Sequence, residues 1–219
     1  MALLEVTLQA LHTIAPPLLI DADTQADTVD TLLNRIALCD DEKEIKAVLD
    51  LICLHSTPTP LTTEGLLNVI TLIPNPLLIV EVIPQLCGNT PAEIEVVMQA
   101  FRDLVNRDRS FLVPVLGALG QLHLPTHIAA NVFDIACESI SIIDESDVSA
   151  VIKCILQTLA GRWHTPQAEV FLTTLRLESA RFSPSTLVLV LGLMQDSVRF
   201  NAPAARCLLR SAVSRARNL

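Results

Sequence analysis

The segment TPAEIEVVMQAFRDLVN, residues 90–106, decides the fold class of this 219-residue chain. Thr90 and Glu93 have the spacing of a capping box, and Pro91 stands at the first helical position, where a missing N–H leaves no hydrogen bond unmade. The apolar residues recur at the spacing of one helical face. They are Ile94, Val97, Met98, Phe101, Leu104 and Val105. The segment therefore predicts an amphipathic helix that begins at Pro91.

Proline residues predict where other helices begin. Proline disrupts a helix interior but is accepted in the first turn. Several of the 13 prolines follow a residue that can cap a helix, as at residues 75–76, 165–166 and 183–184. With Ser110 and Asp144 as further caps, we expect helices to begin near residues 76, 91, 110, 125, 144, 166, 184 and 203.

These expected starts recur with a regular period. Alternate starts are separated by 34, 34 and 40 residues in one series and by 34, 41 and 37 residues in the other. A period in the high thirties, made of two helices, is typical of HEAT and armadillo repeats. Each helix pair stacks on its neighbours because it cannot bury its apolar face alone. We therefore predict an all-α fold, an α-solenoid of HEAT/armadillo-like helix pairs over residues 61–219.

Residues 1–60 are expected to form N-terminal helices without a domain boundary. Residues 27–56 read as two helices joined by an acidic turn at residues 40–42, and residues 56–60 read as a loop. The first twenty residues fit either a helix or a poorly ordered lead-in.

The segment LVLVLGLMQDSVRF, residues 187–200, begins with eight apolar positions and ends with polar and charged residues. Eight positions are too few to cross a bilayer, which takes about 18 or more. Ser183 and Pro184 predict a helix start just before the segment. The alternating Leu and Val residues leave a buried strand as the alternative. If the segment is helical, its continuous apolar start predicts that neighbours cover it on several sides.

Composition narrows the class of protein further. Hydrophobic residues make up 51% of the chain and aromatic residues 3%, so aliphatic side chains must build the core. The six cysteines are spread without a Cys-x-x-Cys pair, which gives no spacing for a zinc or redox site. We expect free thiols in a reducing, intracellular compartment. The chain shows neither a basic leader nor a run long enough for a transmembrane helix.

Charge is unevenly distributed along the chain. The net charge of −9 opposes general nucleic-acid binding, but residues 197–219 contain five arginines and no acid. On a helix that begins at Pro203, Arg206, Arg210 and Arg217 fall within about 40° of each other. This face predicts either a contact with phosphates or an acidic partner, or an ordinary solvated surface. On that helix four apolar residues would pack inward: Leu208, Leu209, Ala212 and Val213.

A search for reaction chemistry finds no complete site. The segment GALG, residues 117–120, lacks the Lys-Ser/Thr pair of a phosphate-binding loop, and close packing of helices explains its glycines. His123 and His127 flank Pro125 at a predicted loop-to-helix junction, so they are either a metal pair or two ordinary histidines, one of them capping. Because no nucleophile–base pair is recognisable, we expect a protein without enzymatic activity, cofactor or metal.

An acidic cluster lies at residues 40–44. It could bind a cation or a basic partner, but it lacks the alternating ligands and the glycine of a calcium loop. A solvated turn is the other interpretation. The cluster consists of Asp40, Asp41, Glu42 and Glu44.

The order of three segments resembles a known family. LLNVITLIPNPLLIVEVIPQLCG (66–88) is followed by SFLVPVLGALGQLHL (110–124) and then by DVSAVIKCILQTL (147–159). This succession is similar to the N-terminal solenoid of the Fanconi anaemia group D-two family. The similarity covers about residues 60–160 well and residues 161–219 loosely.

The resemblance implies a nuclear, non-enzymatic scaffold of DNA interstrand cross-link repair. Members of that family pair with a paralogous partner to form a clamp around double-stranded DNA, and one attached ubiquitin regulates them. They are several times longer than 219 residues, so the resemblance also implies that this chain is a partial one. The alternative function from another class is a HEAT-like adaptor for protein–protein interactions in transport or signalling.

The resemblance also assigns a regulatory position. In the family, the ubiquitin-acceptor lysine lies just before an Ile-Arg-Tyr run, and residues 198–200 (VRF) are the nearest counterpart here. Without a gap, the acceptor position falls on Gln195, and no lysine follows Lys153. Either the alignment is shifted, or this chain is not modified there.

Overall fold

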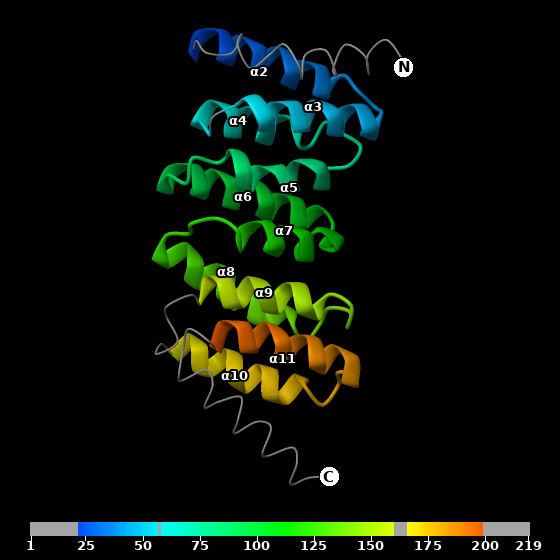
Figure 1. The fold of residues 1–219 in the computed structure, drawn as a ribbon, viewed down its shortest axis with the longest axis vertical. Helices are drawn as coiled ribbons and strands as arrows, with labels where there is room; N and C mark the ends of the chain where they lie inside the picture. The colour runs from blue at the N-terminus through cyan, green and yellow to red at the C-terminus, as the bar shows by residue number, and fades with distance from the viewer. Residues whose placement is uncertain (1–21, 57, 160–165, 199–219) are drawn as a thin grey trace. The chain divides into compact units, whose positions relative to one another are not determined.

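The computed structural model describes residues 22–56, 58–159 and 166–198 (Figure 1). Regular structure in these ranges is helical, without a strand, so the all-α prediction is confirmed and the strand alternative for residues 187–198 is wrong. No helix in the same ranges is long and apolar enough to cross a membrane. The helices are α2 (Ala22–Ala37), α3 (Glu42–His55), α4 (Pro60–Val69), α5 (Leu77–Leu86), α6 (Pro91–Arg107), the 3-10 helix η1 (Arg109–Phe111), α7 (Leu112–Leu119), α8 (Thr126–Ser139), α9 (Val148–Thr158), α10 (Pro166–Glu178) and α11 (Pro184–Val198).

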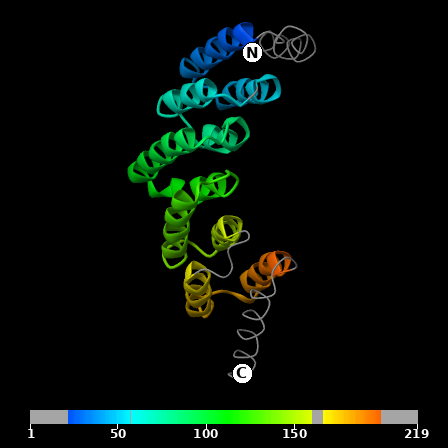
Figure 2. The ribbon, with the colours of Figure 1, turned by 90° about the vertical axis from the view of Figure 1, so that its left-hand side faces the viewer.

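The chain divides into two compact units, Met1–Pro114 and Val115–Leu219. In the first unit, α2 packs against α3 and α4, α3 packs against α5, and α4 packs against α5 and α6. Helices that are two apart along the chain therefore lie against each other. Figures 1 and 2 show α3 and α4 at one level of this unit, between α2 and the α5–α6 pair.

The second unit repeats this pattern of contacts. There α8 packs against α9, α9 packs against α11, and α8 packs against α10. Helices two apart again lie against each other, and α9 lies between α8 and α11 in the network of contacts. In both units the contacts place the even-numbered helices in one row and the odd-numbered helices in another.

The turn that follows a helix has the same geometry at four places. The N–H three residues beyond the last helical residue donates a hydrogen bond to the carbonyl of that last residue. These turns follow α4, α7, α8 and α10. The bonds join Leu72 to Val69, Leu122 to Leu119, Ile142 to Ser139, and Arg181 to Glu178, at 2.9, 3.2, 3.0 and 2.9 Å.

The helix that the sequence predicted most fully is confirmed in detail. The Thr90 hydroxyl accepts a hydrogen bond from the Glu93 N–H at 3.3 Å, and the Glu93 carboxylate accepts one from the Thr90 N–H at 3.2 Å. Pro91 is the first helical residue. The predicted apolar stripe is buried from Ile94 to Leu104, while Val105 at its end is half-buried.

Other predicted starts are confirmed within a residue or are wrong for local reasons. Helices begin at Pro166 and Pro184 and directly after Pro76 and Pro125, as expected. The cap expected at Ser110 is wrong, because the Asp108 carboxylate caps η1 by accepting the Ser110 N–H at 2.8 Å, and helical structure begins at Arg109, one residue before the expected start.

The start at Asp144 is also wrong. Residues 144–147 form a turn that is closed by the Asp147 N–H on the Asp144 carbonyl, and α9 begins at Val148. The start expected near residue 203 lies outside the described residues.

The N-terminal region contains the two helices expected over residues 27–56. They are α2 and α3, and the Asp41 carboxylate caps α3 by accepting the Lys43 N–H at 3.0 Å. The loop expected to end at residue 60 is one residue shorter, because Pro60 begins α4 and the Thr59 hydroxyl caps it. The lead-in of the first twenty residues lies outside the described residues.

Candidate interaction surface

The predicted regulatory position, Gln195, lies on α11 near its end and is exposed to solvent. Its amide side chain has no nucleophilic amine, so it cannot form the isopeptide bond that a lysine forms with ubiquitin. The surface around it depends on how α11 is held in the second unit.

Hydrogen bonds from the α8–α9 turn fix the start of α11. The Ser183 hydroxyl caps the helix by accepting the Thr186 N–H at 3.3 Å, and the Glu145 carboxylate accepts the Ser183 N–H. The pKa of Glu145 lies below its ordinary value, because its carboxylate accepts hydrogen bonds from the hydroxyls of Ser183 and Thr186 and from the Ser183 N–H. The carboxylate also suits the positive end of the helix dipole. This turn thus determines where α11 starts.

A second contact joins the same two turns. The Arg181 guanidinium donates to the Ser141 carbonyl at 2.8 Å and forms an ion pair with Glu178 at 2.6 Å. Arg181 lies in the turn before α11, and Ser141 lies in the turn before α9. The two helices therefore start side by side, in agreement with the packing of α11 against α9.

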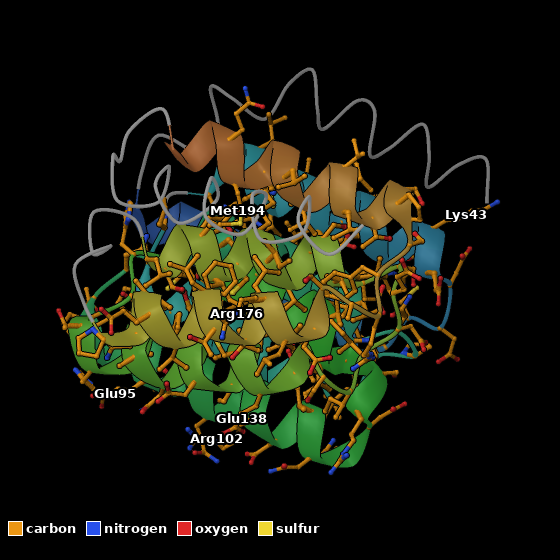
Figure 3. The ribbon with its side chains drawn as sticks, turned by 90° about the horizontal axis from the view of Figure 1, so that it is seen from below. Lys43, Glu95, Arg102, Glu138, Arg176 and Met194 are labelled. Carbon is orange, nitrogen blue, oxygen red and sulfur yellow. The ribbon has the colours of Figure 1, made fainter. Side chains whose placement is uncertain are left out.

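The two faces of α11 differ sharply in burial. Val190 is 3% exposed and Met194 is fully buried, whereas Val188 is 69% exposed. Figure 3 labels Met194 on this helix. Val188 and Val190 are two residues apart, which places them nearly opposite each other at about 100° per residue. Leu189 and Leu191 are exposed as well. The expectation that neighbours cover this helix on several sides is therefore wrong, because only the face toward α9 is buried.

Helix α10 has the same two-faced character. Ala168, Phe171 and Leu175 are buried, while Val170 and Leu177 are exposed. Val170 follows the buried Ala168 by two positions and Leu177 follows the buried Leu175 by two, so exposed and buried residues again lie nearly opposite each other. We call the exposed apolar side chains of these two helices the outer face; they are Val170, Leu177, Val188, Leu189 and Leu191.

The outer face is unusual for its apolar content. It contains five of the twelve large apolar side chains that are exposed in the described part of the chain, on two of its ten α-helices. Single exposed apolar residues are normal, but neighbouring ones mark a surface that another segment or molecule covers, and on α11 three of them lie within four residues, at Val188, Leu189 and Leu191. Gln195 follows Leu191 by one helical turn, so it lies at the edge of this cluster.

The other predicted site residues take local roles or lie outside the described ranges. Arg206, Arg210 and Arg217 lie outside them. His123 and His127 are exposed, and no group of three or more His, Cys, Asp or Glu residues in the described ranges could hold a metal ion. The described residues therefore do not add a ligand to the histidine pair.

In the acidic cluster, two carboxylates are engaged in local structure. Glu44 accepts a hydrogen bond from the Arg35 guanidinium at 2.7 Å, and Asp41 caps α3. The cluster thus links the end of α2 to the start of α3. This use agrees with the interpretation as a solvated turn.

The glycine pair of residues 117–120 is only partly explained by close packing. A Cβ atom on Gly120 would lie 3.2 Å from the Cα atom of Cys154 in α9, so this glycine allows a close approach of backbones. Around Gly117 a Cβ atom would meet nothing within 4 Å. Close packing therefore accounts for Gly120 and not for Gly117.

The five cysteines in the described ranges are free thiols. Burial raises the pKa of Cys137 and of Cys154 to about 12, and it also raises the pKa of Cys39, Cys53 and Cys87. Because the thiolate is the reactive form, these residues are poor nucleophiles near neutral pH. Cys207 lies outside the described residues.

Sequence reasoning missed one buried ionisable group. Glu93 is predicted as a cap, but it also accepts hydrogen bonds from the Thr63 hydroxyl at 3.3 Å and the Gly88 N–H at 3.2 Å. It is 6% exposed. Thr63 lies 30 residues earlier in the chain, so no local sequence pattern connects the two. The carboxylate thus joins α4, the end of α5 and the start of α6.

The described residues bring together an apolar outer face with an exposed glutamine at its edge. Their anchoring contacts are helix caps and turn-to-turn hydrogen bonds. Comparisons with known proteins do not identify this surface, because no family model, no curated protein and no solved structure matches the chain.

Proposed function

We propose that this chain is a non-enzymatic scaffold built as an α-solenoid of HEAT- or armadillo-like helix pairs. The main support is that helices two apart along the chain pack against each other in each unit. Such contacts are those of stacked helix pairs, in which each repeat touches only its neighbours. The same turn follows α4, α8 and α10, where it joins the two helices of one pair, and it also follows α7, where it joins two neighbouring pairs.

The narrower proposal is a role in DNA interstrand cross-link repair, as a nuclear scaffold of the Fanconi anaemia group D-two type. It rests on the order of the segments at residues 66–88, 110–124 and 147–159. The helices α4 and α5, α7, and α9 occupy those three segments in that order. In this proposal the chain contributes to a clamp with a paralogous partner, and double-stranded DNA is bound by the full complex.

The test of the narrower proposal is co-purification with the paralogous partner. The tagged chain is isolated from cells of its own source before and after treatment with a DNA cross-linking agent, and bound proteins are identified by mass spectrometry. We expect the partner to be enriched, and more strongly after damage. Recovery of transport or signalling proteins instead would support the HEAT-like adaptor, and absence of the partner under damage would contradict the repair role.

The proposal also makes a specific statement about Gln195. If the alignment is correct, this position is where the family ligase would act, and the native chain is not modified there. We expect Gln195→Lys to gain one ubiquitin with that ligase, whereas Gln157→Lys, at an exposed position of α9, should not. Equal modification of both variants, or of neither, would show that the alignment is shifted.

A further inference from the structure

We propose that α11 is a detachable helix, which leaves α9 as one piece while α8, α9 and α10 stay folded, and that two hydrogen bonds between turns determine how often it does so. Local opening of this kind begins at elements with few buried apolar contacts and few links to the rest of the fold. The proposal concerns the motion of one helix within the second unit, so it does not depend on the function proposed above.

Very little of α11 is buried. Over residues 184–195, where the structure describes its side chains, only Val190 and Met194 are buried. By contrast, α8 has seven buried residues, α9 has six and α10 has three. Since burial of apolar surface is the main force that holds helices together, α11 is held to α9 by a small share of it.

The neighbours of α11 keep their own packing when α11 leaves. α11 packs on α9, whereas α10 packs on α8. α9 also packs on α8, and its backbone at Cys154 lies against Gly120 at the end of α7. The loss of α11 therefore leaves the contacts among α7, α8, α9 and α10 in place.

Two hydrogen bonds, which we call the clasp, join the α10–α11 turn to the α8–α9 turn and hold the start of α11. The Glu145 carboxylate accepts the Ser183 N–H, and the Arg181 guanidinium donates to the Ser141 carbonyl at 2.8 Å. Each bond includes a charged group, which makes it stronger than a neutral one. Both bonds are exposed, so water can take over their donors and acceptors when the clasp opens.

The proposed opening changes the surroundings of one side chain in particular. Met194 is fully buried while α11 lies on α9, and it would meet solvent when the helix leaves. Met98 on α6, in the first unit, is 8% exposed and takes no part in this motion. The oxidation of Met194 relative to Met98 therefore reports how often α11 is open.

Hydrogen exchange of the full chain, followed by peptide mass analysis, tests the proposal. In the native chain we expect the amides of residues 188–195 to exchange about tenfold faster than those of α8 and α9. Glu145→Ala should speed the exchange of α11 by a further factor of about three, which is typical for the loss of one hydrogen bond. Exchange of α8, α9 and α10 should stay unchanged. The matched control is Glu138→Ala, at an exposed residue of α8, which should have no effect on α11.

The other half of the clasp is tested by peroxide oxidation. We expect Arg181→Ala to speed the oxidation of Met194 about threefold and to leave that of Met98 unchanged. The matched control is Arg176→Ala, at an exposed residue of α10, which should change neither rate. Figure 3 labels Arg176, Glu138 and Met194.

Three results would overturn the proposal. If α11 exchanges as slowly as α8 and α9 in the native chain, it is not a detachable helix. If α10 exchanges together with α11, the helix pair opens as a unit and α11 does not leave alone. Equal effects of the clasp variants and their matched controls would show that the clasp does not govern the opening.

Discussion

At the scale of single residues, Glu93 shows how one carboxylate joins three segments of the first unit. It accepts hydrogen bonds from the N–H groups of Gly88 and Thr90 and from the hydroxyls of Thr63 and Thr90. Burial by itself would raise the pKa of Glu93, but these hydrogen bonds together outweigh it and hold the pKa below its ordinary value. The charged form is therefore the one that the fold stabilises.

We predict that Glu93→Gln destabilises the protein by about 2 kcal/mol at pH 7, because an amide cannot accept all four bonds and charged hydrogen bonds are the stronger ones. Since the folded pKa is depressed, the stabilisation by the carboxylate is present above its unfolded pKa and is lost as the pH falls through the folded pKa. The difference between wild type and variant should thus shrink on acidification. Urea unfolding at pH 7 and at pH 4 measures it.

The control for this experiment is Glu81→Gln, at an exposed residue of α5. Its unfolding free energy should stay within about 0.5 kcal/mol of wild type, as is usual for surface substitutions. A loss as large as that of Glu93→Gln would mean that lost charge, and not the buried hydrogen-bond set, is responsible.

The buried thiols allow a second prediction at this scale. Burial raises the pKa of Cys137 and Cys154 to about 12, so almost no thiolate forms at pH 8. We expect neither residue to react with a thiol reagent in the native protein, and both to react promptly in denaturant. Labelling followed by peptide mass analysis identifies each site, and rapid native labelling of either residue would contradict the structure.

At the scale of elements, two similar glycines differ in how closely a neighbouring helix approaches them. Gly120, directly after α7, lies against the backbone of α9 at Cys154, whereas Gly117 within α7 faces open space. The two glycines are three residues apart and look alike in sequence. Their difference arises from the neighbouring helix.

We predict opposite effects of alanine at these two glycines. Gly117→Ala should stabilise the protein by about 0.5–1 kcal/mol, because alanine favours the helix and nothing obstructs its methyl group. Gly120→Ala should destabilise it by about 1 kcal/mol or more, because α7 and α9 would have to move apart. Thermal unfolding of the pair checks this, and a stabilising Gly120→Ala would refute the close approach.

At the scale of the whole molecule, charge is strongly segregated along the chain. The total of 15 basic and 24 acidic residues includes five arginines in residues 199–219, so residues 1–198 carry 10 bases and 24 acids, a net charge of −14. Such an acidic body repels nucleic acid at long range. If the chain contacts DNA in a complex, the arginine-rich segment is the part with the required charge.

We predict that replacing Arg206, Arg210 and Arg217 together by Glu weakens DNA binding of the complex and makes it less dependent on salt. Each lost phosphate contact lowers the slope of log K against log salt by about 0.9, so three contacts lower it by roughly 2.7. Binding isotherms at several salt concentrations give the slope. An unchanged slope and affinity would assign these arginines to an ordinary solvated face.

The sequence by itself determined the fold class and most helix boundaries. Capping residues, prolines and apolar periodicity act within a few residues, so the starts at Pro91, Pro166 and Pro184 could be predicted from local chemistry. The same logic failed at Asp144 and Ser110. There a carboxylate close to the expected cap made different hydrogen bonds, Glu145 to the start of α11 and Asp108 to η1.

Only the tertiary structure decided which of these helical faces are covered. Residues far apart in the chain meet in the hydrogen bond between Glu93 and Thr63 and in the contact of Gly120 with α9. The exposed side chains of α11 likewise depend on which neighbours the fold gives that helix. An apolar stripe predicts burial without naming its partner, because the hydrophobic effect has no direction. The sequence LVLVLGLMQDSVRF thus predicted a helix, and the structure showed that its side toward α9 is buried and its other side is not.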